Sequence, residues 1–245
     1  MPAQPTTAVA AATDVGHVRR RNEDHAVVGT TLVTGDHDEA TDELASPAML
    51  AVLDGMGGHP AGDVASRLVA EVVAGADLPV DRDAVADLVA TMQRRLLAHM
   101  RDHPETTGMG TTLAAASLLD PATALVIGIG DSAALWWTDD LVDVVPRDRS
   151  EGGWITQVLG GASEADHLDA HVLELTGPGR LLLASDGLTD VVEPTVVAAA
   201  LRDHPEPAKA VRALVEAALQ RGGPDNVTVV VADLQAPEAQ VDVGR

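Results

Sequence analysis

Three aspartates in the sequence stand where an apolar run meets a turn rich in glycine or proline. Asp54 and Asp186 each follow such a run and precede a glycine, and Asp225 lies in a Gly-Pro-Asp-Asn turn before another run. A carboxylate at a strand end is rigid at its base and exposed at its tip, and glycines let backbone carbonyls and water approach. Mg²⁺ and Mn²⁺ prefer a few hard oxygen ligands, with water completing the octahedron. The pattern therefore indicates a divalent-cation site.

Two further groups add to this set. Asp131 lies in a Gly-Ile-Gly-Asp-Ser stretch between apolar runs, and Arg19 closely precedes the acidic residues Glu23 and Asp24. A guanidinium is well suited to bind a phosphoryl group. Asp-Gly is a common turn dipeptide, so no single member of the set is informative alone. Together they predict a site where cations meet a phosphate group.

The elements that must position these residues follow from hydrophobic periodicity. Apolar stripes with the helical period predict helices around 64–72, 85–96 and 211–219. Short apolar runs bounded by turn residues predict strands at 49–53, 111–119, 122–129, 133–138, 141–145, 180–184 and 227–232. The four runs within 111–145 are expected to form a meander. Because strands and helices come in groups, we predict an α+β fold with mainly antiparallel sheets.

Composition excludes several function classes. The chain has 245 residues and a formal net charge of −22, which disfavours nucleic acid and anionic membrane partners. The absence of cysteine excludes disulfides, thiolate zinc sites and cysteine nucleophiles. No apolar window or signal-peptide pattern is found, so a cytoplasmic protein is expected. We expect a disordered tail over residues 1–11, a catalytic domain over 12–234 and a flexible tail over 235–245.

Short stretches containing these residues occur in a defined order. They are Thr-Asp-Val-Gly at 13–16 with Arg19 and Asn-Glu-Asp at 22–24, Asp-Gly-Met-Gly-Gly-His at 54–59, Gly-Met-Gly-Thr-Thr at 108–112, Gly-Asp-Ser at 130–132, Ser-Asp-Gly-Leu at 185–188 and Gly-Pro-Asp-Asn-Val-Thr at 223–228. In this order they resemble the PPM family of type 2C metal-dependent serine/threonine protein phosphatases, in its bacterial form. The resemblance covers nearly the whole chain.

The resemblance implies a four-layer αββα sandwich, with two packed, mainly antiparallel sheets flanked by helices and a binuclear Mg²⁺ or Mn²⁺ centre at one edge. It implies that Asp54 bridges both metals, that Asp186 and Asp225 bind the first, and that the carbonyl of Gly55 binds the second. Asp131 and Asp186 would share a third, weaker cation.

The resemblance also assigns roles around the metals. Glu23 and Asp24 would hold metal-bound waters, and Arg19 would bind the substrate phosphate. A metal-bridged hydroxide would then hydrolyse phosphoserine and phosphothreonine in proteins phosphorylated by serine/threonine kinases. Two alternatives stay open: a catalytically silent module that binds phosphoproteins, and a narrow-specificity phosphatase of a regulatory protein such as an anti-sigma-factor antagonist.

The sequence departs from the family pattern mainly on the substrate side. Met56 stands where some members carry a histidine proposed as general acid, so the acid is left undefined, and His59 is expected to be structural. Arg149 stands where the family usually has a histidine. The stretch 148–159, which is a longer flap in the family, is short here. These departures bear on substrate selection rather than on metal binding.

Overall fold

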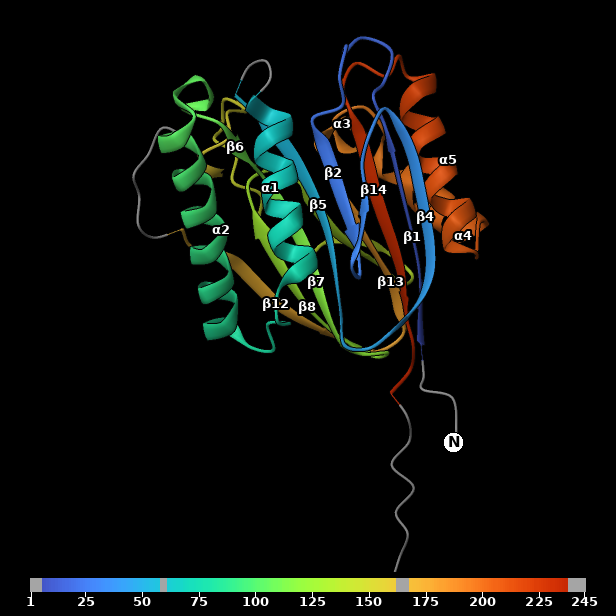
Figure 1. Ribbon diagram of the computed structural model, residues 1–245. Helices are drawn as coiled ribbons and strands as arrows, with labels where there is room; N and C mark the ends of the chain where they lie inside the picture. Colours follow the sequence, from blue (N-terminus) through green and yellow to red (C-terminus); the bar gives the residue numbers. More distant parts are fainter. Residues whose placement is uncertain (1–5, 58–60, 162–167, 238–245) are drawn as a thin grey trace, which may run out of the picture.

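Two antiparallel sheets pack face to face and carry helices on their outer faces (Figure 1). The structure is a computed structural model that describes residues 6–57, 61–161 and 168–237. The helices are α1 (Ala61–Gly75) and α2 (Arg82–Asp102) over one sheet, and α3 (Asp186–Thr189), α4 (Pro194–Asp203) and α5 (Pro207–Gln220) over the other. The predicted α+β sandwich with four layers is therefore confirmed.

The sheet beneath α1 and α2 has eight strands. Their order is β11-β6-β5-β7-β8-β12, with β2 paired to β5 and β3 paired to β2. The strands are β2 (Asp24–Val28), β3 (Thr31–Val33), β5 (Ala48–Met56), β6 (Gly110–Thr111), β7 (Leu113–Asp120), β8 (Thr123–Ile129), β11 (Leu159–Gly160) and β12 (His171–Thr176). A short 3₁₀ helix, Pro104–Thr106, follows α2.

The second sheet has six strands in the order β10-β9-β13-β14-β1-β4. They are β1 (Thr6–Asp14), β4 (His37–Ala45), β9 (Ala133–Trp137), β10 (Leu141–Asp143), β13 (Gly179–Ala184) and β14 (Val227–Leu234). Strand β4 is an edge strand whose exposed positions are mostly polar and acidic. Charged edges of this kind hinder pairing with another sheet.

Apolar side chains fill the three spaces between the four layers. One cluster lies between α1, α2 and the eight-stranded sheet, a second lies between the sheets, and a third lies between the six-stranded sheet and α3–α5. Since the chain lacks Phe and Tyr, these clusters consist mainly of Val, Leu and Ala. The predicted helical stripes belong to α1, α2 and α5 and face these clusters.

The predicted N-terminal tail is wrong for residues 6–11, because β1 begins at Thr6 and pairs with both β4 and β14. Val9 and Ala11 face the space between the sheets, while Ala10 and Ala12 face the helices. A strand buried on both faces has no apolar–polar alternation, so its pattern gave no strand signal. Residues 1–5 lie outside the described residues.

The predicted meander over 111–145 is also wrong. β7 pairs with β8 and β9 pairs with β10, but β8 and β9 belong to different sheets. The chain crosses between the sheets through Gly130, Asp131 and Ser132. Within the described ranges, no helix is long and apolar enough to span a membrane.

Candidate metal centre

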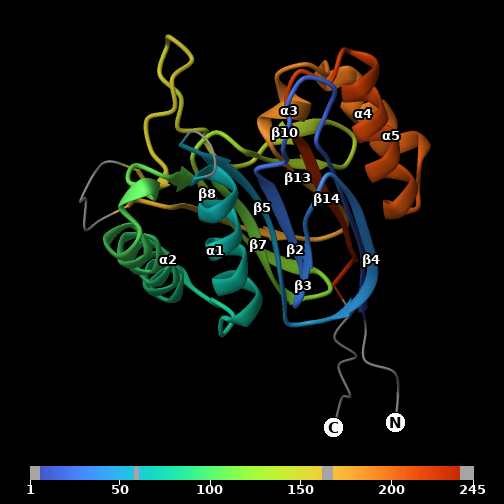
Figure 2. The same ribbon diagram turned by 45° about the horizontal axis from the view of Figure 1, so that its top comes forward.

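The acidic residues singled out in the sequence come together at one end of the sandwich. In Figure 1 this is the upper end, where the β1–β2 connection, the start of α1, α3 and the segment before β14 lie side by side. Figure 2 brings this end forward and shows the segment 146–158, in yellow, projecting beside it. Both sheets contribute, since β2 and β5 belong to one and β13 and β14 to the other.

Asp54 is held by its neighbours on both sides. In the β2–β5 pair it stands directly opposite Asp24. Its backbone N–H donates to the hydroxyl of Thr112 at 3.0 Å, and its carbonyl accepts from the Thr112 N–H at 2.9 Å and from the Thr111 hydroxyl at 2.9 Å. The Gly-Met-Gly-Thr-Thr stretch therefore fixes the backbone that carries the Asp54 carboxylate.

Gly55 lies against the first turn of α1, where no side chain would fit. A Cβ on Gly55 would come within 2.2 Å of the Gly62 carbonyl oxygen and 2.7 Å of the Glu23 carbonyl oxygen. The Glu23 carboxylate also reaches Gly62, where a Cβ would be 2.5 Å from Oε2. The Ser66 hydroxyl donates to the Glu23 carbonyl at 2.6 Å. The Gly55 carbonyl and the Glu23 carboxylate thus converge at the start of α1.

Asn226 connects the last acidic stretch to the first. Its side-chain amide donates to the carbonyls of Val15 and Arg21, both at 2.9 Å, and its Oδ1 accepts from the Glu23 N–H at 2.9 Å. The sequence analysis gave Asn226 no role. An amide whose bonds all go to backbone of one loop is a clamp, and this clamp places Glu23 beside Asp225.

Arg19 reaches Asp225 from the same loop. Its Nη2 lies 2.6 Å from Asp225 Oδ2, and the side chain is 54% exposed. Burial disfavours the charged guanidinium, but Asp225, Asp54 and Glu23 outweigh this effect and raise its pKa. Arg19 therefore faces the acidic centre on one side and solvent on the other.

Asp186 begins α3 and Asp131 lies on the crossover between the sheets. Arg149 binds both: its Nη2 lies 3.0 Å from Asp186 Oδ2 and its Nε lies 2.6 Å from Asp131 Oδ2. It also binds Asp190, one turn after Asp186, at 3.0 Å through Nη1. Asp190 was not predicted as a site residue, although its spacing of four residues from Asp186 on a helical turn was an available signal.

The pKa of Asp24 reflects a buried carboxyl among other carboxyls. Burial raises its pKa to about 7. The nearby hydroxyls of Ser185 and Thr228 offset part of this effect, and Asp186 and Asp225 add to it. Neither Asp24 oxygen has a partner in hydrogen-bond geometry among the described residues.

The pKa values of Asp54 and Asp186 are raised in the same way. Burial raises the pKa of Asp54 well above its ordinary value, and neighbouring carboxylates add to the effect. In decreasing order these are Asp24, Asp186, Asp225 and Asp131. Burial likewise raises the pKa of Asp186 to about 6, with Arg149 opposing the rise. Carboxyls in such surroundings are stabilised by a proton or a cation.

The donor set has the chemistry that hard divalent cations prefer. It consists of carboxylates and a backbone carbonyl, the ligands of Mg²⁺ and Mn²⁺, and includes the buried, unpartnered oxygens of Asp24. Within residues 6–57, 61–161 and 168–237, no three acidic or histidine side chains already stand in coordination geometry. Arg19 and Arg149 bind oxygens of Asp225 and Asp186 instead. The structure describes the acidic stretch at 54–59 only as far as residue 57, so His59 lies outside the described residues.

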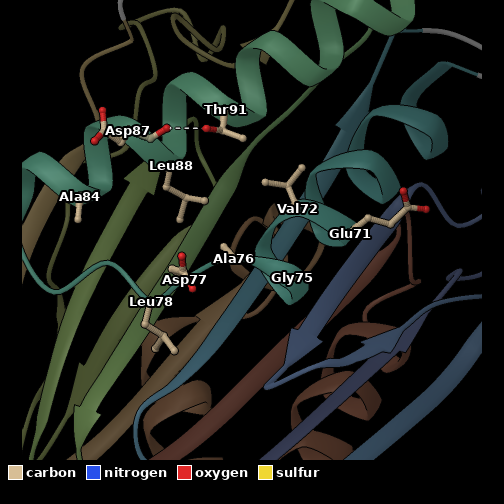
Figure 3. Close-up of a pocket in the computed structure, with 10 residues that line it drawn as sticks. All are labelled: Glu71, Val72, Gly75, Ala76, Asp77, Leu78, Ala84, Asp87, Leu88 and Thr91. Carbon is tan, nitrogen blue, oxygen red and sulfur yellow. Dashed lines mark hydrogen bonds between the residues drawn. The ribbon is translucent and has the colours of Figure 1, made fainter.

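The groove between α1 and α2 lies away from this centre (Figure 3). It is lined by Glu71, Val72, Gly75, Ala76, Asp77, Leu78, Ala84, Asp87, Leu88 and Thr91. These residues come from the end of α1, the α1–α2 connection and the beginning of α2, whereas the start of α1 lies at the acidic centre. The groove shares no residue with the candidate site.

Known proteins resemble this chain along most of its length. The sequence profile described as protein phosphatase 2C matches residues 35–230. The serine/threonine protein phosphatase PstP of Mycobacterium tuberculosis is 34% identical over 250 residues, a match that covers 92% of this chain and 44% of that protein. The chain therefore spans about half the length of this curated relative.

Solved structures agree with the sequence comparison. A crystal structure of the M. tuberculosis phosphatase PstP/Ppp is 31% identical, with a TM-score of 0.78, and the match covers 94% of this chain and 99% of that one. A structure of the PstP catalytic domain with two manganese ions is 32% identical, with a TM-score of 0.76 and the same coverage. The resemblance drawn from the acidic stretches is confirmed: the chain belongs to the protein phosphatase 2C family.

Proposed function

We propose that this chain hydrolyses phosphoserine and phosphothreonine in proteins at a centre that binds two Mn²⁺ or Mg²⁺ ions. The observation that carries the proposal is the meeting of Asp54 on β5, Asp186 at the start of α3 and Asp225 in the turn before β14. The relative PstP is named a serine/threonine protein phosphatase, and its catalytic domain has been solved with two manganese ions. Both facts support the same function here.

The proposed ligands are those that the family resemblance implies, and their residues lie at the acidic end. Asp54 would contact both ions, Asp186 and Asp225 one of them, and the Gly55 carbonyl the other. Glu23 and Asp24 would orient water ligands from the β2 side. When bound, two such ions lower the pKa of water enough to supply hydroxide at neutral pH. The chain itself supplies the rigid backbone on which these oxygens converge.

Arg19 would bind the phosphoryl group of the substrate. Its guanidinium lies at the rim of the centre, held by Asp225 and more than half exposed. A planar fork of N–H donors can bind two phosphoryl oxygens at once and stabilise the charge that develops on them. Arg20 and Arg21 are also exposed but make no side-chain hydrogen bond or ion pair among the described residues.

The expected third cation does not fit as well as the first two. It would need oxygens of Asp131 and Asp186, and Arg149 binds Oδ2 of each. No step of the proposed reaction depends on a third ion.

The proposed substrates are cytoplasmic proteins that serine/threonine kinases have phosphorylated. The test is hydrolysis of a phosphothreonine peptide and of p-nitrophenyl phosphate by the full chain, with Mn²⁺ and with EDTA, beside the matched variant Asp54→Asn. Mn²⁺-dependent turnover that is lost in Asp54→Asn would support the proposal. Binding of the phosphopeptide without turnover would contradict it and favour a silent binding module.

A further inference from the structure

Arg149 binds more carboxylates at the acidic end than Arg19 does. All three nitrogens of its guanidinium are used: Nε on Asp131, Nη2 on Asp186 and Asp190, and Nη1 on Asp190, at 2.6 to 3.1 Å. One fixed positive charge thus lies among three carboxylates. A guanidinium stays protonated at any pH the protein tolerates, so deprotonation cannot release Arg149 from these carboxylates.

The backbone holds Arg149 in register with this cluster. The preceding residue, Asp148, donates its N–H to the Gly130 carbonyl at 2.8 Å and accepts the Gly130 N–H through Oδ2 at 2.8 Å. Its Oδ1 lies 3.0 Å from His171 Nε2. Gly130 precedes Asp131 and Asp148 precedes Arg149, so these backbone contacts bring Arg149 and Asp131 together. The contact is therefore part of the fold at the crossover between the sheets.

Of the three carboxylates that bind Arg149, that of Asp131 is the one shielded from solvent. Asp131 is 2% exposed and Arg149 is 25% exposed. Charge-assisted hydrogen bonds with little access to water are among the stronger ones. A third cation that used Oδ2 of Asp131 and Oδ2 of Asp186 would have to displace the arginine from both oxygens.

We propose that the Arg149 guanidinium takes the place of a third metal ion, so that the centre works with two ions and one built-in positive charge. This inference rests on the proposed function. By binding Oδ2 of Asp186, Arg149 leaves Oδ1 for a cation of the main pair and fixes the rotation of the carboxylate. Arg149 is thus a positioning residue. It also ties the turn Ser150–Ile155 to the rim, through the bridge between Arg149 and Ile155.

The second carboxylate oxygen of Asp131 allows an alternative arrangement, in which a third ion binds beside Arg149. This oxygen, Oδ1, is buried and has no hydrogen-bond partner in the described part of the chain. An ion that used this oxygen would bind beside Arg149 instead of being replaced by it. Counting bound ions distinguishes the two arrangements.

The experiment counts Mn²⁺ ions bound per chain, by equilibrium dialysis with metal analysis, in the wild type and in Arg149→Gln. We expect two ions in the wild type and one additional, weaker ion in Arg149→Gln. The extra ion should disappear in the double variant Arg149→Gln/Asp131→Asn. Arg147→Gln is the matched control, because Arg147 binds Asp143 and Thr189 nearby and should leave the count unchanged.

Two results would overturn the inference: a third ion in the wild type that Asp131→Asn removes, or no additional ion in a folded Arg149→Gln. If Arg149→Gln does not fold, Asp131→Asn alone decides, because an unchanged ion count supports the inference and the loss of one weak ion contradicts it. A wild type that binds fewer than two ions contradicts the proposed two-ion centre. The difference of one ion between wild type and Arg149→Gln still decides the role of Arg149 in that case.

Discussion

Asp24 and Asp54 stand directly opposite each other in the β2–β5 pair, with Asp24 almost completely buried. Like charges facing each other across two strands destabilise a sheet. Burial is the largest cause that raises the pKa of both groups. Protonation of these two carboxyls therefore stabilises the fold of the metal-free protein.

This arrangement predicts a pH dependence of stability in EDTA. The pKa of Asp24 is about 7 in the folded chain, so between its ordinary value of 3.8 and about 7 the folded state binds more protons than the unfolded state. The free energy of unfolding must then fall as the pH rises through that window. We expect the melting temperature in EDTA to be higher near pH 5.5 than near pH 7.5, measured by thermal denaturation.

Asp24→Asn provides the matched control for this slope. The variant keeps the size of the side chain but cannot ionise, so its melting temperature should depend less on pH. Asp186, with a pKa of about 6, keeps part of the slope in both proteins. A stability in EDTA that rises with pH over this window, or an identical slope in Asp24→Asn, would contradict the assignment.

Addition of Mn²⁺ should stabilise the fold strongly. A ligand that binds only the folded state adds about 2.7 kcal/mol at a hundredfold excess over its Kd. For a chain of this size that corresponds to a rise in Tm of roughly 5–10 °C. Thermal melts with Mn²⁺ and with EDTA measure the difference, and Asp54→Asn should lose most of it. Superimposable wild-type melts would argue against a metal centre.

Arg19→Ala should weaken turnover without weakening metal binding. The loss of a charge-assisted contact with two phosphoryl oxygens costs about 1.5–3 kcal/mol, or roughly 10- to 150-fold in kcat/KM. Mn²⁺ affinity should not fall, because Arg19 is no ligand of the ion and its removal leaves Asp225 Oδ2 free to bind it. Steady-state kinetics beside Arg20→Ala provide the test. Equal losses in the two variants would show that Arg19 has no special role.

Asn226→Ala should destabilise the fold as well as the site. It removes three hydrogen bonds to the loop that carries Glu23, which together contribute about 2–4 kcal/mol. Asn226→Asp is the informative second variant, since it keeps the acceptor for the Glu23 N–H but loses both donors. Urea denaturation should rank the wild type above both variants, with Asn226→Asp no more stable than Asn226→Ala, because a carboxylate oxygen would face the Val15 and Arg21 carbonyls. A variant as stable as the wild type would refute the clamp.

The positions of the acidic residues could be predicted because each carries a local signal, an Asp in a turn with Gly or Pro at one end of an apolar run. Asp54 and Asp186 follow such a run and Asp225 precedes one, and the strands β5, β13 and β14 are present. The sequence did not predict that β8 and β9 separate into different sheets, because a run of apolar residues does not specify its partner strand. For the same reason, the contacts of Arg149 with Asp131 and Asp186 depend on a crossover that no local pattern encodes.

β1 shows a second limit. Its small and β-branched residues face apolar layers on both sides, so neither alternation nor polarity marked it as a strand. The clamp by Asn226 was hidden for a related reason, because its partners are backbone atoms more than 200 residues away in sequence.

The crossover at Gly130–Ser132 has a consequence for local motion. At this end of the sandwich, acidic side chains from the two sides of the boundary between the sheets face each other. Asp24 and Asp54 lie on one side, and Asp186 and Asp225 lie at the ends of strands on the other. Cations shared across that boundary would tie the two sheets together, whereas charge repulsion without them favours opening. Amide hydrogen exchange at the adjoining ends of β2 and β14 should therefore slow when Mn²⁺ is added, while exchange at their opposite ends should change much less.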